Sequence, residues 1–117
     1  MARVVALFND LMLGSNVQGV LTAGGHEVEL VSDEVAARAQ APEADVLVVD
    51  LAAQNFDGVS LVDSMKAGGE LGKTKTVGVY SHVDVETRTR AVEAGFDLVT
   101  PRSRMAREGA KLVEDVV

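Results

Sequence analysis

The chain has 117 residues, a length that fits one compact domain and leaves no room for a second of ordinary size. Hydrophobic residues make up 47% of it, which favours a folded core over disorder, and the lack of cysteine excludes disulfides and thiolate metal sites. Eighteen acidic against eleven basic residues argue against nucleic-acid binding, which needs Lys and Arg to neutralise phosphates. We expect a single domain over residues 1–117, in the cytoplasm.

The first half of the chain alternates short apolar runs with segments of helical period. The run at Val4–Phe8 is too short to cross a membrane and favours a buried strand. Alternating apolar and polar residues at His26–Val31 predict an edge strand with one covered face. The expected elements are strands at Val4–Phe8, His26–Val31 and Val46–Val49, a helix at Leu11–Ala23, and a second helix capped by Asp33 and running to Ala39.

The second half continues the same alternation. A helix over about Gly58–Lys66 precedes a strand at Thr76–Tyr80. Asp84 is expected to cap the next helix, which Gly95 ends, and Leu98-Val99 forms a short last strand. The last predicted element is a helix capped by Ser103, with an inward face of Met105, Gly109, Leu112, Val113 and Val116.

Five strands alternating with five helices predict an α/β fold. Because the central strands are wholly apolar, we expect a five-stranded parallel sheet with helices on both faces. The expected strand order is 2-1-3-4-5, the flavodoxin-like arrangement. In open sheets of this kind the functional crevice lies at the carboxyl ends of the strands, where the strand order reverses.

Residues with useful chemistry follow several of the expected strands. Asp10 and Asp50 follow neighbouring strands and should converge in one crevice, although forty residues separate them. Two carboxylates repel each other unless a cation or a proton lies between them, and Mg²⁺ prefers oxygen ligands. Such a site can hold a phosphoryl group transferred to an aspartate. Ser81 could donate a hydrogen bond to that group, and Arg102 could pair with it bidentately.

Each of these residues alone has a simpler interpretation. An aspartate after a strand often caps the next helix. For Asp10 alone, we give this structural role and a functional role equal weight. Ser81 is a common residue type after a strand, and a lone Arg102 is most often a surface charge. His82 suits a loop better than a metal site, because the other histidine, His26, is distant in the sequence. The combination at four strand ends is what points to function.

Three groups of residues match one known pattern in order and spacing. Asp50 is followed eight residues later by Gly58, the glycine of an Asp-Gly pair that opens a helix. The second group runs from Ser81 through Asp84 to Ala91–Gly95 and Asp97, and the third is Asn9-Asp10. With these segments, the chain resembles response-regulator receiver domains over essentially its whole length. The resemblance implies a phosphoacceptor at Asp50, supporting roles for Ser81 and Arg102, and Mg²⁺ held by Asp10, Asp50 and Asn9.

The chain departs from the family pattern at several positions of this site. Asn9 replaces the first of two acids, which should weaken Mg²⁺ binding, and Gln54 replaces a proline. Counting without gaps puts Arg102 at the family's lysine, whereas matching Pro101 to the family's proline would put Thr100 there. Arginine keeps the charge but not the compact ammonium geometry.

Two further departures bear on switching. His82 stands where receivers usually have a small residue that gives the phosphodonor access. Val99 stands where an aromatic residue normally moves with the hydroxyl residue. The usual coupling between those two side chains is therefore not expected to operate in this chain.

Three functional hypotheses follow. The first is a stand-alone signal receiver that accepts a phosphoryl group on Asp50 from a histidine kinase or phosphotransfer protein. The second is a degenerate pseudo-receiver that binds a protein without phosphorylation, and the third is a small-molecule binder or enzyme of flavodoxin-like shape. The third is disfavoured because the segment after the first strand offers an acid in place of glycines or hydroxyls that would cradle a phosphate.

The expected partners are proteins. Because no second domain follows Val117, output is expected through a surface contacting a downstream protein, with neither nucleic acid nor membrane involved. We expect a monomer or weak homodimer with no enzymatic activity beyond self-phosphorylation and autodephosphorylation. By the resemblance, the contact surface is the face of the fourth helix, fifth strand and fifth helix, with Val85, Arg88, Val92, Arg102 and Arg104.

Overall fold

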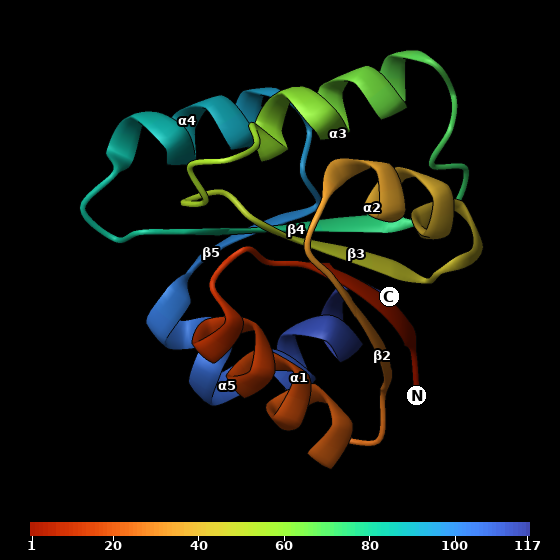
Figure 1. The fold of residues 1–117 in the computed structure, drawn as a ribbon, viewed down its shortest axis with the longest axis vertical. Helices are drawn as coiled ribbons and strands as arrows, with labels where there is room; N and C mark the ends of the chain where they lie inside the picture. Colours follow the sequence, from red (N-terminus) through yellow and green to blue (C-terminus); the bar gives the residue numbers. More distant parts are fainter.

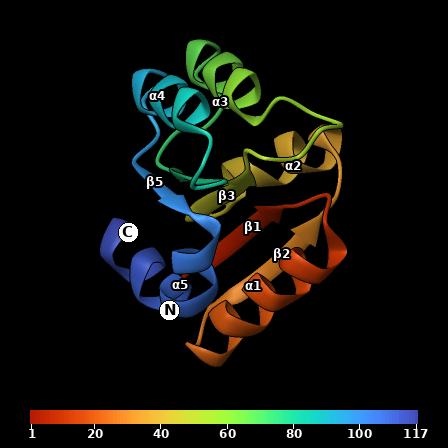
Figure 2. The ribbon, with the colours of Figure 1, turned by 90° about the vertical axis from the view of Figure 1, so that its left-hand side faces the viewer.

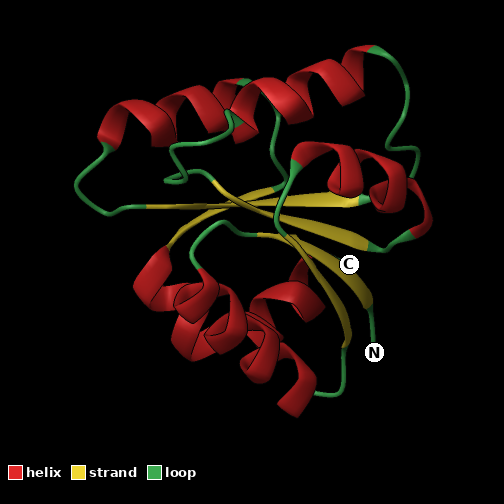
Figure 3. Ribbon diagram, in the orientation of Figure 1, coloured by secondary structure: helices red, strands yellow, loops and turns green.

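The computed structural model describes all 117 residues and contains five strands and five α-helices in strict alternation (Figures 1 and 3). A single short 3₁₀ turn at Ala41–Glu43 follows the second helix. The strands are β1 Arg3–Leu7, β2 Glu27–Val31, β3 Val46–Asp50, β4 Lys75–Tyr80 and β5 Leu98–Pro101. The helices are α1 Leu11–Ala23, α2 Glu34–Gln40, α3 Gly58–Ala67, α4 Val85–Glu93 and α5 Arg102–Val116.

All five strands form one parallel sheet in the order β2-β1-β3-β4-β5. The predicted α/β fold, strand direction and strand order are therefore confirmed. β1 and β3 are neighbours, with Leu7 paired to Val49, so the segments after these two strands leave the sheet at the same edge. The order reverses between β1 and β3, which places the expected crevice there.

Helices cover both faces of the sheet, and alternate side chains along each strand supply two separate cores (Figure 2). One face packs against α1 and α5, and we call its apolar cluster the α1/α5 core. The opposite face packs against α2, α3 and α4, and we call its cluster the α2–α4 core. The α1/α5 core takes Val4, Ala6, Val46, Val48, Val77 and Val79 from the strands, and the α2–α4 core takes Val5, Leu7, Leu47 and Val49.

Four of the five α-helices are capped by an aspartate that directly precedes them. Asp10, Asp33, Asp57 and Asp84 each accept hydrogen bonds from backbone N–H groups of the first helical turn. The caps predicted at Asp33 and Asp84 are thus confirmed. The cap predicted at Ser103 is wrong, because α5 begins at Arg102, directly after β5, and has no side-chain cap. Pro101 ends the strand and already has the extended conformation of a helix-capping residue, so no loop separates strand from helix.

The first two strands have bounds that differ by one residue from those predicted. β1 ends at Leu7, although Phe8 is buried and its N–H still donates to Val31 O at 3.1 Å. His26 lies just before β2 and is buried with both ring nitrogens in contact. Nδ1 accepts from the N–H of Ala2 at 2.9 Å, and Nε2 lies 3.1 Å from Ala110 O. His26 thereby ties the N-terminus to α5, a structural role that the alternating pattern did not reveal.

Close packing at Gly58 brings the start of α3 against the end of β3. A Cβ at this position would lie 2.4 Å from Val49 Cγ1, so a larger residue would push α3 away from the sheet. The Asp57-Gly58 pair therefore serves two purposes, since Asp57 caps α3 and Gly58 allows the close approach. No helix of the chain combines the length and the apolar character needed to cross a bilayer.

Candidate functional site

Asp50 is the last residue of β3 and is completely buried. The alternation along β3 puts its side chain on the same face as Val46 and Val48, toward α1 and α5. Its Oδ1 accepts a hydrogen bond from Ala52 N–H at 3.1 Å. A buried carboxylate needs partners of opposite charge, because desolvation disfavours the ionised form.

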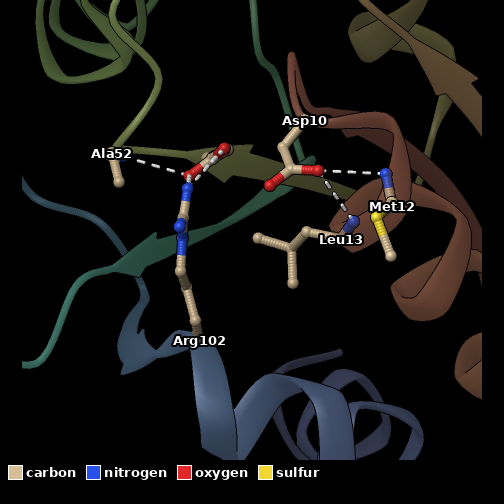
Figure 4. A network of polar contacts seen from close by, with 6 residues as sticks. Asp10, Met12, Leu13, Ala52 and Arg102 are labelled. Atoms are coloured by element: carbon tan, nitrogen blue, oxygen red, sulfur yellow. Dashed lines mark hydrogen bonds and ion pairs between the residues drawn. The ribbon is translucent and has the colours of Figure 1, made fainter.

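Arg102 supplies that partner from the first residue of α5 (Figure 4). Its Nη2 lies 3.3 Å from Oδ1 and 3.2 Å from Oδ2 of Asp50, so one nitrogen serves both carboxylate oxygens. The adjacent Nε is buried and has no hydrogen-bond partner. The side chain is 36% exposed, so the guanidinium connects the buried carboxylate to the surface of the crevice.

Asp10 approaches the same crevice from the end of β1 (Figure 4). Its Oδ1 accepts from Met12 N–H at 3.0 Å and from Leu13 N–H at 3.1 Å, which makes it the cap of α1. Its Oδ2 accepts no hydrogen bond and is free for another partner. Asn9 is exposed beside it. No group of three or more His, Cys, Asp or Glu side chains is arranged so that it could hold a metal ion.

Ser81 follows β4 directly, and β4 is the strand beside β3. Asp50 is paired with Val79, two residues before Ser81, so the serine lies at the same edge of the sheet. Its side chain makes no hydrogen bond, whereas its carbonyl accepts from Asp84 N–H at 2.8 Å. His82 is exposed in the following loop. The structure thus brings Arg102 into contact with Asp50, and leaves the Ser81 hydroxyl free nearby.

Thr100, the alternative occupant of the family's lysine position, also lies in this region. It is 1% exposed on β5, in register with Val79 and hence in the same row as Asp50. Its Oγ1 has no hydrogen-bond partner. In the sequence, the signal for Thr100 is that it is a polar residue next to the apolar Leu98-Val99. The contact of Arg102 with Asp50 favours the ungapped alignment over the alternative that placed Thr100 at the lysine position.

Electrostatic contacts next to the site hold the α3 and α4 caps in the ionised form. The backbone N–H of Ser60 is the main cause of a lowered pKa at Asp57, helped by the Ser60 hydroxyl and the Arg90 guanidinium. The hydroxyl of Thr87, together with its N–H, lowers the pKa of Asp84. Arg90 Nη2 lies 3.2 Å from Asp57 Oδ2, so α4 is tied to the start of α3.

Two positions that depart from the receiver pattern, Val99 and Gln54, lie away from Asp50 in the hydrogen-bond network. Val99, at the position of the family's aromatic residue, is half-buried and packs against the α2–α4 core. Gln54 is exposed in the loop between β3 and α3. Neither side chain contacts Asp50 through a hydrogen bond.

The fold matches solved receiver domains along almost its full length. The chemotaxis response regulator CheY4 of Vibrio cholerae is 20% identical, with 100% of this chain and 99% of that chain covered and a TM-score of 0.78. The Francisella response regulator 1452 receiver domain is 15% identical, with 99% and 96% covered and a TM-score of 0.85. The NarL signal receiver domain of Mycobacterium tuberculosis is 19% identical, with 97% and 94% covered and a TM-score of 0.82.

This chain has the receiver fold. At these identities the likeness concerns the fold. No protein-family model matches the chain, and no curated protein matches it. In the receiver fold the carboxyl edge of the sheet holds Asp50, Arg102, Asp10 and Ser81, the residues that sequence analysis selected.

Proposed function

We propose that this chain is a signal receiver that accepts a phosphoryl group on Asp50. The observation that carries the proposal is the pairing of a fully buried carboxylate with a guanidinium whose Nε is buried and unused. A structural ion pair has no need of an unsatisfied donor, and leaving such a donor buried costs about 1–3 kcal/mol. A larger oxyanion at Asp50 would give that donor an acceptor.

The chemistry is nucleophilic attack by a carboxylate oxygen of Asp50 on the phosphorus of a phosphohistidine. The new O–P bond gives an acyl phosphate, while the P–N bond breaks and the histidine nitrogen keeps its electron pair. Nε and Nη2 of Arg102 form a planar fork that suits two phosphoryl oxygens, with hydrogen bonds about twice as strong as neutral ones. The free hydroxyl of Ser81 is a further donor at the same edge.

A magnesium ion fits this donor set, and we propose that it binds weakly. The free Oδ2 of Asp10, the carboxylate of Asp50 and the amide oxygen of Asn9 are the hard oxygen ligands that Mg²⁺ prefers. When bound, the ion supplies positive charge that offsets the charge of the transferring phosphoryl group. The neutral Asn9 reduces the negative charge available to it, and Arg102 already neutralises part of the charge on Asp50.

Output in this proposal passes through a protein contact. The phosphoryl group comes from a histidine kinase or phosphotransfer protein, and a downstream protein binds the face formed by α4, β5 and α5. On that face Val85 is 65% exposed and Val92 is 54% exposed, and the side chains of Arg88 and Arg104 are exposed as well. The chain acts in the cytoplasm as a monomer or weak homodimer, without enzymatic activity beyond gaining and losing its own phosphoryl group.

One observation favours a second candidate, a pseudo-receiver that binds its partner without phosphorylation. Both oxygens of Asp50 are occupied by Arg102, and Asn9 lacks the charge of a second acid. If the ion pair is never opened, the site is a permanent part of the fold.

Measuring the intact mass separates these candidates. The protein is incubated with acetyl phosphate or phosphoramidate, with and without Mg²⁺, and compared with Asp50→Asn and with Asp63→Asn. Asp63 is exposed on α3, so Asp63→Asn makes the same chemical change away from the site. We expect one added phosphoryl group that requires Mg²⁺, is absent in Asp50→Asn and is retained in Asp63→Asn. No added mass, or equal addition in Asp50→Asn, would contradict the proposal.

A further inference from the structure

β2 forms one free edge of the sheet (Figure 2). It pairs only with β1; at the two ends of the ladder Glu27 N–H donates to Ala2 O at 2.9 Å, and Phe8 N–H donates to Val31 O at 3.1 Å. In a parallel ladder, alternate residues of a strand turn their backbone groups toward the same neighbour. The N–H and C=O groups of Val28 and Leu30 therefore point outward, without a strand to receive them.

The two edges of the sheet differ in how they are protected. β5 has only four residues and ends in Pro101, which has no N–H to donate. β2 has five residues with neither proline nor lysine, and its sequence is Glu-Val-Glu-Leu-Val. It is thus the edge that remains able to accept another strand.

Glutamates determine which strand fits. Glu27 and Glu29 are exposed and lie on the same side of β2, because alternate residues share a face. An open groove of about 860 Å³ runs beside them, and its polar lining includes Arg3, Glu27, Glu29, Gln40 and Glu43. Three of those five side chains are acidic and one is basic, so the groove is negative, as is the whole chain at −7.

A second copy of this chain does not suit this edge. Pairing β2 with β2 would put glutamates opposite glutamates on one face, and like charges directly opposite each other destabilise strand pairs. A strand with Lys or Arg at alternate positions would instead oppose Glu27 and Glu29, which lie about 6.6 Å apart along the strand. Each opposite-charge pair contributes about 0.2–1 kcal/mol.

We propose that the edge of β2 binds an extended basic segment of a partner protein by strand addition. The backbone groups of Val28 and Leu30 hold the added strand, and Glu27 and Glu29 select basic side chains at every second position. Main-chain hydrogen bonds give such a complex its affinity, and the alternate side chains give it specificity.

The probe is a blocked pentapeptide that alternates lysine and valine, added to the full chain. At a peptide concentration about ten times Kd, we expect amide hydrogen exchange at Val28 and Leu30 to slow about tenfold, as mass action requires. A peptide of the same sequence, methylated on the backbone nitrogens that face β2, should give no protection. Unchanged exchange at both amides would overturn the proposal, and equal binding of the methylated peptide would reduce the interaction to charge attraction.

Charge reversal provides the matched control. Glu29→Lys should weaken binding of the lysine peptide at least about threefold, while Asp63→Lys, the same kind of charge change on exposed α3, should change it less than twofold. Val28→Pro removes one outward N–H without removing a β1 hydrogen bond, so it should abolish protection of Leu30 while circular dichroism stays that of the folded protein. Equal weakening by Glu29→Lys and Asp63→Lys, or exchange that slows with protein concentration alone, would contradict the proposal. Asp50→Asn should leave binding unchanged.

Discussion

The starts of the first four α-helices differ in kind from the start of α5. α1, α2, α3 and α4 each follow an aspartate whose carboxylate accepts hydrogen bonds from backbone N–H groups of the first turn. α5 begins at Arg102 after Pro101 and has no such cap. A cation in the first turn is also unfavourable beside the positive end of the helix dipole. α5 therefore lacks two ordinary stabilising features at its start.

What α5 gains is the contact between Arg102 and Asp50. Because the helix follows β5 without a loop, its first residue lies at the carboxyl edge of the sheet, where Nη2 reaches both oxygens of the buried carboxylate. The four capped helices show how this chain stabilises a helix start when the first residues of the helix have no role in the site. The departure at α5 indicates that the position of Arg102 is set by the site.

The largest expected effect comes from removing the guanidinium. Arg102→Gln should slow phosphorylation of Asp50 by acetyl phosphate about 10–100-fold, since hydrogen bonds to charged groups contribute about 1.5–3 kcal/mol. It should also lower the free energy of urea unfolding at pH 7 by about 1–3 kcal/mol, because it leaves a buried carboxylate without its partner.

Arg104→Gln is the matched control for this experiment. It removes the same charge two residues later in α5, where Arg104 forms an exposed pair with Glu108 at 3.5 Å. Such surface pairs contribute little, so the rate and the unfolding free energy should stay close to those of the parent. Equal effects of the two substitutions would mean that Arg102 is an ordinary surface charge.

A smaller effect is expected at a conventional cap. Asp57→Ala should lower the free energy of unfolding at pH 7 by about 0.5–2 kcal/mol, because Ser60 N–H loses its acceptor. The pKa of Asp57 is lowered in the folded state, chiefly by that N–H, so its contribution is present above the ordinary value of 3.8 and is lost as pH falls through the lowered pKa.

The contribution of Asp57 is measured by urea unfolding of Asp57→Ala and of the parent. Both proteins are unfolded at pH 7 and at steps below pH 3.8. The difference between the two proteins should shrink over the acidic steps. Asp63→Ala, at an exposed position of α3, should show little difference at any pH. A difference that stays constant down the acidic series would mean that the ionised carboxylate of Asp57 is not what stabilises α3.

How much of this molecule is predictable follows from which interactions are local. Apolar runs and aspartate caps act over a few residues, so the sheet and the caps at Asp33 and Asp84 can be predicted from the sequence. The role of His26 cannot, because its partners at Ala2 and Ala110 come together only in the folded chain. Asp10 and Asp50 are far apart in the sequence, and their convergence is predicted only by the rule that parallel strands end at one edge of the sheet.

The start of α5 was mispredicted for a related reason. Ser103 has the right residue type for a cap, and local propensity alone favours a helix beginning after it. The structure instead continues the strand to Pro101 and turns directly into helix, so that Ser103 lies inside the first turn. A long-range contact between Arg102 and Asp50 outweighs the local preference for a cap at Ser103. In the sequence, only the opposite charges of these two side chains indicate that contact.

The smallest expected effect tests that point directly. Because Ser103 caps nothing and is exposed in the first turn of α5, Ser103→Ala should change the free energy of unfolding by no more than about 0.5 kcal/mol, with a slight gain from alanine's higher helix propensity. Urea unfolding beside Asp57→Ala gives the comparison. A loss as large as that of Asp57→Ala would mean that α5 begins after Ser103 in solution. Arg102 would then lie outside the helix, and its contact with Asp50 would no longer explain why α5 lacks a cap.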